Sequence, residues 1–281
     1  MIVIDGIDVQ IDGAPLHAFG ADGVTRIVTD IKGWGATKPT GQPVQKPRQS
    51  GAWMGYSYSG ARVMTVTGLL DGPSAASVET AFDDIVASFP LGDAVLSVTE
   101  GGMTRYVTVR RTDEVVPTRL SPTAIQWSVI VTAVDWRKFG AVLSGTTRLP
   151  SSTGGVTFPL TFPLAFTATT VNGQVALTNP GNEVGPVRLR IDGPCQGPVI
   201  THISSGAQLV FASSLSLGAG EWLDVDMDAR SVLANGQSSR NGSLTSRGWS
   251  AFDPGVNVWA FTASSFSSSA LLTVYATPAW L

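Results

Sequence analysis

Residues 124–133 read AIQWSVIVTA, and this stretch decides the fold class because its pattern alternates without a break. Large apolar side chains recur at every second position from Ile125 to Val131, with mainly polar side chains between them. A period of two places successive side chains on opposite faces of a β-strand. The stretch therefore predicts a strand that buries one face in a core.

Similar patterns flank this strand toward the N-terminus. Asp-Gly pairs at 5–6 and 12–13 bound a short alternating run, which favours a hairpin of residues 2–4 with 7–11. Further strands are predicted at 24–32, 52–58, 62–70, 94–99 and 104–110. The first half of the chain is thus predicted to be antiparallel β structure.

One segment of this half has a different period. From Ser74 to Phe89, the apolar residues fall at intervals of three and four, as on one face of an amphipathic helix. Ser74 is a suitable N-cap, and Pro90 cannot continue the helix. We predict a single helix at about 74–89 that covers the sheet.

The second half contains only β signals. Its apolar stretches at 187–191, 209–211, 222–227, 256–262 and 271–275 are separated by turn residues at the spacing of a β-sandwich. A stretch rich in Ser, Thr and Gly precedes them and lacks apolar periodicity. We therefore predict domains at 1–145 and 156–281, with a linker at 146–155.

Composition narrows the function classes. Only 14% of the residues are charged, against roughly 25% in typical soluble domains. Either much of the surface is buried against partners, or a surface rich in Ser and Thr keeps the chain in solution. The net charge of −3 gives no broad basic surface for nucleic acid.

No signal peptide is apparent at the start, and no apolar run approaches the ~20 residues of a membrane span.

Residues for catalysis or metal binding are sparse. Cys195 is the only cysteine, and His17 and His202 fall in different predicted domains, so we predict no metal site, no cofactor and no enzyme. Asp224, Asp226 and Asp228 have the spacing that begins a calcium loop, but the glycine and glutamate that should follow are absent. In a strand these acids would share the solvent face.

Residues 33–51 have no periodicity and contain three prolines, which is long for a loop inside a compact domain. We predict that the segment 32–51 is an arm that packs on a neighbouring subunit. The interface residues expected in and beside it are cations and tryptophans: Lys32, Trp34, Lys38, Lys46, Arg48 and Trp53.

The tryptophans leave a second function open. Trp249 lies in a predicted loop and is the best candidate for an exposed ring that stacks on a sugar. The alternative function is therefore a carbohydrate-binding adhesion module in the C-terminal sandwich, contacting host glycans. A glycoside hydrolase is a third, weaker interpretation, because sequence cannot place two carboxylates across a cleft.

Several motifs occur in an order that resembles one family, the siphophage distal tail (Dit-like) proteins. The strand at 127–133 runs into Val-Asp-Trp-Arg-Lys, where the family commonly has proline in place of Trp136. Residues 228–236 resemble the family's hairpin with Asp, Arg, Val and Asn-Gly, and 253–259 its Pro-Gly-x-Asn turn. Residues 271–281 resemble its closing strand and terminal tryptophan. The resemblance covers nearly the whole chain.

The resemblance implies a mainly β fold: an N-terminal split-barrel-like domain with one covering helix, followed by a galectin-like β-sandwich. It implies a structural virion protein of the bacteriophage tail tip, assembled in the host cytoplasm as a homohexameric ring. That ring would join the tail tube protein to the tail-associated lysin or fibre or to the baseplate. DNA would pass through it without specific binding. The family supplies no catalytic residues.

Overall fold

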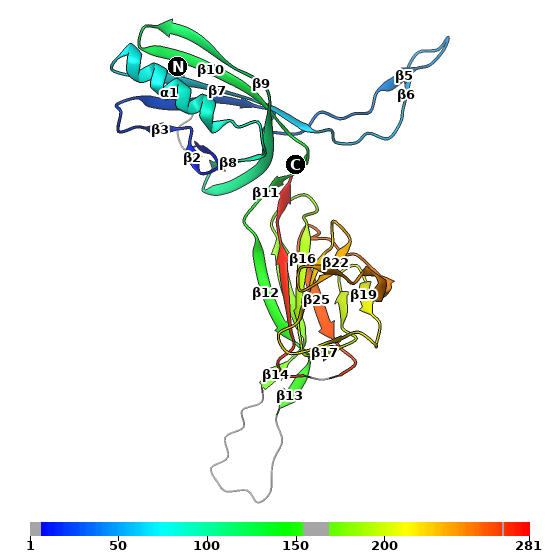
Figure 1. The fold of residues 1–281 in the computed structure, drawn as a ribbon. Helices are drawn as coiled ribbons and strands as arrows, with labels where there is room; N and C mark the ends of the chain where they lie inside the picture. Colours follow the sequence, from blue (N-terminus) through cyan, green and yellow to red (C-terminus); the bar gives the residue numbers. More distant parts are fainter. Residues whose placement is uncertain (1–6, 154–168, 266) are drawn as a thin grey trace, which may run out of the picture. The chain divides into compact units, whose positions relative to one another are not determined.

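The computed structural model describes residues 7–153, 169–265 and 267–281. The chain is mainly β, as predicted, and divides into two compact units, Met1–Gly140 with Leu281 and Ala141–Trp280 (Figure 1). Among the described residues, no helix has the length and hydropathy needed to cross a membrane.

Unit 1 is built on antiparallel strands that pair in the order β2-β1-β8-β9-β10-β7-β4-β3. Strand β9 is long enough to pair with β8 through its first half and with β10 through its second half. β11 pairs with β9. The strands of this unit are β1 (Ile7–Ile11), β2 (Ala14–Pro15), β3 (Ala18–Phe19), β4 (Thr25–Lys32), β5 (Pro43–Gln45), β6 (Ala52–Met54), β7 (Arg62–Asp71), β8 (Ala94–Glu100), β9 (Met103–Ser121), β10 (Ala124–Ala133) and β11 (Lys138–Phe139).

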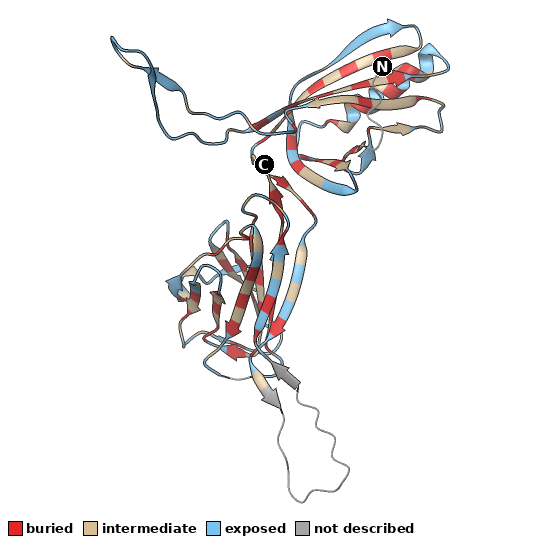
Figure 2. Ribbon diagram, turned by 180° about the vertical axis from the view of Figure 1, so that it is seen from behind, coloured by how far each residue is buried: buried red, intermediate tan, exposed pale blue. Residues whose placement is uncertain are grey.

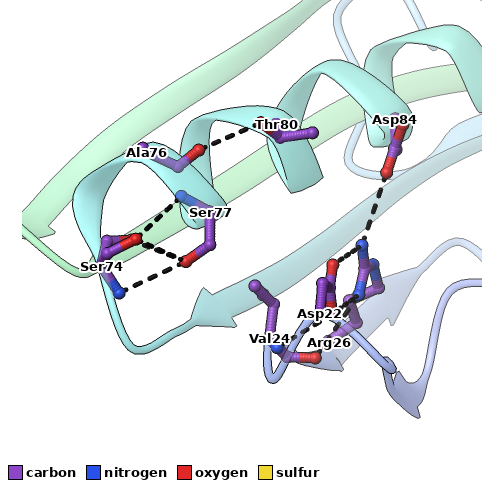
Figure 3. Close-up of polar contacts among 8 residues, drawn as sticks. All are labelled: Asp22, Val24, Arg26, Ser74, Ala76, Ser77, Thr80 and Asp84. Carbon is purple, nitrogen blue, oxygen red and sulfur yellow. Dashed lines mark hydrogen bonds and ion pairs between the residues drawn. The ribbon is translucent and has the colours of Figure 1, made fainter.

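Helix α1 (Ala75–Ser88) confirms the predicted amphipathic segment. Ser74 is the N-cap: its hydroxyl accepts a hydrogen bond from the Ser77 amide, and the Ser77 hydroxyl lies 3.3 Å from the Ser74 amide (Figure 3). The helix packs against β7 and β10 through Val78, Ala81 and Ile85. Its apolar face therefore closes the core of unit 1.

Arg26 connects the start of β4 to this helix. Its guanidinium lies 2.8 Å from the carboxylate of Asp22 and 3.5 Å from that of Asp84 on α1 (Figure 3). The paired guanidinium lowers the pKa of Asp22 to about 2. The pairs lie at the surface, where ion pairs contribute little to stability.

Unit 2 is a sandwich of two antiparallel sheets, as the turn spacing predicts. The first has the order β12-β26-β16-β21-β22-β23 and the second β15-β25-β18-β19-β24. The strands of the first sheet are β12 (Leu143–Arg148), β16 (Val187–Asp192), β21 (Trp222–Asp226), β22 (Ser231–Ala234), β23 (Ser238–Ser239) and β26 (Leu271–Ala276). Those of the second are β15 (Gln174–Asn179), β18 (Val199–His202), β19 (Ala207–Phe211), β24 (Leu244–Arg247) and β25 (Gly255–Thr262).

Short elements complete this unit. They are the pairs β13 (Ser151–Thr153) with β14 (Thr169–Val171) and β17 (Cys195–Gln196) with β20 (Ser216–Leu217), together with β27 (Ala279–Trp280) and the 3₁₀ turn η1 (Asn241–Ser243). Figure 2 shows buried positions alternating with exposed ones along the main strands. The buried positions include Leu189 and Ile191 in one sheet and Trp259 and Phe261 in the other. This alternation places the core between the two sheets.

The structure corrects two boundaries and leaves one prediction outside the described residues. Residues 146–148 belong to β12 and 151–153 form β13, so these parts of the predicted linker are strands. Of the strand predicted at 52–58, only Ala52–Met54 is a strand. Residues 2–4, the expected first strand of the opening hairpin, are not described.

Candidate assembly interface

The segment between β4 and β7 folds as a two-stranded hairpin, here called the arm and defined as residues 36–60. Strands β5 and β6 lie within it and extend the β4–β7 pair outward (Figure 1). Backbone hydrogen bonds hold it at two levels, from Lys46 to Gly51 near the tip and from Thr40 to Tyr58 near the base. The predicted unpatterned arm is therefore a hairpin in part, because β5 falls inside the segment 32–51.

Apolar side chains on the arm are largely exposed. Val44 and Trp53 are register partners with 63% and 57% of their surface exposed, and Met54, Tyr56 and Tyr58 are more exposed still. An isolated two-stranded hairpin is marginally stable in water. A contiguous exposed apolar surface typically marks an interaction site. The arm thus has the composition of a surface that another molecule covers.

All charged residues of the arm are basic. No Asp or Glu occurs between Asp30 and Asp71, whereas Lys38, Lys46 and Arg48 lie in the arm. The three cations leave the remainder of the chain with a net charge of −6, against −3 for the whole. An acidic, partly apolar surface would therefore complement the arm.

Two buried cations fix the base of the arm. The Arg62 guanidinium, 1% exposed, donates to the carbonyl oxygens of Gly33, Trp34 and Gly35 at 2.9, 2.9 and 2.6 Å. It also donates to the carbonyl of Trp136 at 2.8 Å. Buried cations require partners of this kind. We call Arg62 and Lys138 the anchor.

Lys138 is the second member of the anchor. Its ammonium donates to the Trp34 carbonyl at 3.0 Å and lies 5.4 Å from the centre of the Trp34 ring. Burial, together with the nearby guanidinium groups of Arg62 and Arg105, lowers the pKa of Lys138 to about 8. Burial also lowers the pKa of Arg62. The anchor therefore holds the backbone of residues 33–35, directly before the arm begins.

The predicted interface residues separate into two groups. Trp53, Lys38 and Arg48 are exposed on the arm and Lys32 is exposed at the end of β4, while Lys46 is half-buried near the tip. Trp34 is buried, and its indole nitrogen donates to Glu100 at 3.4 Å. Within one chain the Trp34 ring is part of the core of unit 1, and its place in an interface stays a prediction.

Sequence reasoning missed both members of the anchor. Arg62 shares its strand face with Met64 and Val66, which are buried. Arg62 therefore occupies a position of the alternating pattern at which the other residues are apolar and buried. A cation at such a position is a signal that could have identified Arg62 in the sequence. Lys138 follows the strand pattern by five residues and carries no comparable signal.

Trp249, the expected glycan contact, is half-buried and packs against the core of unit 2. It lies in a loop after β24, as expected, but its ring is half-buried, and its contact with a glycan stays a prediction. His202 is buried, and its ring nitrogens form hydrogen bonds with Ser205 and Asn257. The centre of its ring lies 5.0 Å from that of Trp259.

The acids of the Asp-x-Asp-x-Asp pattern serve local structure. Asp224 accepts from the Trp222 indole at 2.8 Å, and Asp226 accepts from Arg188 and from the Asp228 amide. Across the described residues, no cluster of three or more His, Cys, Asp or Glu side chains could hold a metal ion.

Comparison with known proteins identifies the fold. No protein-family model and no curated protein sequence matches the chain. The crystal structure of the SPP1 Dit (gp 19.1) protein, described as a paradigm of the hub adsorption apparatus in phages that infect Gram-positive bacteria, matches with a TM-score of 0.67 at 12% identity. The match covers 98% of this chain and 99% of that one. A chain of the phage P2 baseplate in its activated conformation with Ca matches with a TM-score of 0.50 at 11% identity, over 97% and 98% of the two chains. Over nearly its whole length, the chain thus has the fold of the SPP1 Dit hub protein.

Proposed function

We propose that this protein is a structural subunit of a phage tail-tip hub. The observation that carries the proposal is the fold shared with the SPP1 hub protein from one end of the chain to the other. A match confined to one unit would support only a common β domain. The order of motifs along the sequence supports the same role independently of the fold.

In this role the protein acts by assembling. Copies of the chain form a homohexameric ring in which unit 1 supplies the contacts and unit 2 is a galectin-like sandwich. The ring joins the tail tube protein to the baseplate, or to a tail-associated lysin or fibre, and DNA passes through it unbound. The virion is its location, after assembly in the host cytoplasm.

The arm supports this proposal on physical grounds. Its apolar side chains are exposed in the isolated chain, yet its base is held by two buried cations. An arm that reaches a neighbour makes a heterologous contact, and repeated heterologous contacts close into a ring when the rotation allows. The exposed apolar surface is then buried in the assembly.

The test is the mass and shape of the purified full-length protein. We expect native mass spectrometry to give six copies and negative-stain imaging to give a six-fold ring. A stable monomer at micromolar concentration, also in the presence of tail tube protein, would contradict the proposal.

Glycan binding by unit 2 has weaker support, because Trp249 is half-buried against the core. A glycan-binding screen decides between the two roles. Binding that disappears in Trp249→Ala would favour the adhesion module, and we expect no binding.

A further inference from the structure

We propose that the tip of the arm, defined as residues 43–54, docks into a hollow on unit 1 of a second copy of this chain. The inference rests on the proposed function, since it names the surface that receives the arm in the assembly. It comes from two complementary features of unit 1, one on the arm and one on strand β9.

The hollow lies between α1 and the second half of β9. It has a volume of about 360 Å³ and is lined by three apolar side chains, three charged ones and one threonine: Val86, Leu91, Val115, Arg111, Asp113, Glu114 and Thr112. Leu91 is 78% exposed. An apolar side chain so exposed beside a hollow is a natural contact for an incoming aromatic ring.

A β-bulge places the carboxylates at this hollow. Val129 of β10 pairs with Val115, whereas Val131 pairs with Arg111, so residues 112–114 of β9 face a single residue of β10. Bulges bend a strand and redirect its side chains. Asp113 and Glu114 are consequently exposed, and neither forms an ion pair with a described cation.

The arm tip presents the matching pattern. Val44 and Trp53 form an exposed cross-strand pair, and Lys46 and Arg48 lie in the stretch of chain that connects the two strands. The tip thus combines apolar with basic residues, and the hollow combines apolar with acidic ones. Arg111 is the one cation in the lining, so the hollow keeps a net charge of −1.

A second copy is the occupant that these features favour. The arm is free of acids over its whole length, and the remainder of the chain is acidic. Each chain carries both the arm and this hollow, so every copy can donate to one neighbour and receive from another. Such a contact is heterologous and can close a ring.

Disulfide trapping tests the contact in the full chain. Val44→Cys combined with Leu91→Cys should give cross-links between chains after mild oxidation. Val44→Cys combined with Met103→Cys, which places the second thiol at another partly exposed residue of unit 1, should not. Native Cys195 does not interfere, because it is buried and burial raises its pKa to about 11.

Charge reversal gives an independent readout. Asp113→Lys with Glu114→Lys should raise the concentration for half-assembly by about tenfold or more, because like charges then meet at the contact. Adding Lys46→Glu and Arg48→Glu to the same chain should restore assembly. Circular dichroism checks that each variant is folded.

The outcomes separate the two proposals. If wild-type chains assemble but neither the cross-link nor the charge effect occurs, the hollow is not the receiving surface and the hub role stands. If another tail protein, and not a second copy, cross-links to Leu91→Cys, the occupant proposed here is wrong. If wild-type chains remain monomeric, the hub role and the contact both fail.

Discussion

Gly68 lies opposite Trp127 in the ladder between β7 and β10. The Trp127 ring covers the space where a side chain at Gly68 would project, so an added Cβ would overlap the ring. Trp127 is 1% exposed and lies 6.0 Å, centre to centre, from the Phe89 ring. The ring therefore cannot move aside without disturbing the contact with the end of α1.

We expect Gly68→Ala to lower the free energy of unfolding by about 1–3 kcal/mol, the usual cost of overpacking a core. Gly92→Ala is the matched control, because nothing lies within 4 Å of its added Cβ. Urea denaturation followed by tryptophan fluorescence measures both. Equal midpoints for the two variants would mean that Trp127 can repack.

Lys138 makes stability depend on pH. In the folded protein its pKa is about 8, compared with 10.5 for an ordinary lysine. Between these values the unfolded chain binds more protons than the folded chain, so stability rises with pH. Cys195 acts in the opposite direction above pH 9, because burial raises its pKa to about 11.

The informative range is therefore pH 7.5–9. We expect the free energy of unfolding to rise with pH in the wild type more steeply than in Lys138→Met, which has no titrating group at this position. Denaturation midpoints of the two proteins across the range measure the difference. Parallel pH profiles would show that Lys138 keeps its proton in the folded state.

Removing a hydroxyl group at two positions of helix α1 should have opposite effects on the stability of the protein. Ser74→Ala removes the N-cap and should cost about 1 kcal/mol. Thr80→Ala removes a hydroxyl that bonds back to the Ala76 carbonyl inside the helix, where alanine has the better propensity (Figure 3). We expect that substitution to be neutral or stabilising. Thermal denaturation of both variants tests the difference, and a similar loss in both would argue against a capping role.

Elements whose signal is local could be predicted from the sequence. Helix α1 and strands such as β10 and β25 repeat their apolar residues at the period of one element, and each is found where expected. Strand β12 was missed because it is an edge strand rich in Gly, Ser and Thr, held to β26 by backbone pairing. Backbone pairing leaves no trace in side-chain periodicity.

The candidate site was predicted only in part, for the same reason. The absence of periodicity located the arm, but its strands β5 and β6 and its anchor depend on contacts between distant residues. Arg62 and Lys138 meet at the carbonyls of 33–35 across 27 to 104 positions of sequence. Residue type also does not show how far a ring is exposed: Trp34 is buried in the core of unit 1, and Trp249 is half-buried in its loop.

At the scale of the whole molecule, stability and assembly are expected to be coupled through the arm. The core residues of unit 1 and those of unit 2 are buried within a single chain, whereas the apolar side chains of the arm tip are exposed. Folding of one chain therefore leaves apolar surface that only association can bury. Because a partner that binds only the folded state stabilises it by mass action, the melting temperature should rise with protein concentration.

Replacing residues 43–54 with Asn-Gly should remove that dependence, because the tip is lost while both members of the anchor, Arg62 and Lys138, remain. We expect the wild type to melt at a higher temperature with each tenfold increase in concentration, and the shortened chain to melt at one temperature throughout. The shortened chain should retain the far-ultraviolet circular dichroism of a β protein, because none of the buried core residues of unit 1 lies in 43–54. Scanning calorimetry at several concentrations measures both proteins. A shortened chain with the wild-type concentration dependence would place the assembling surface outside the arm tip.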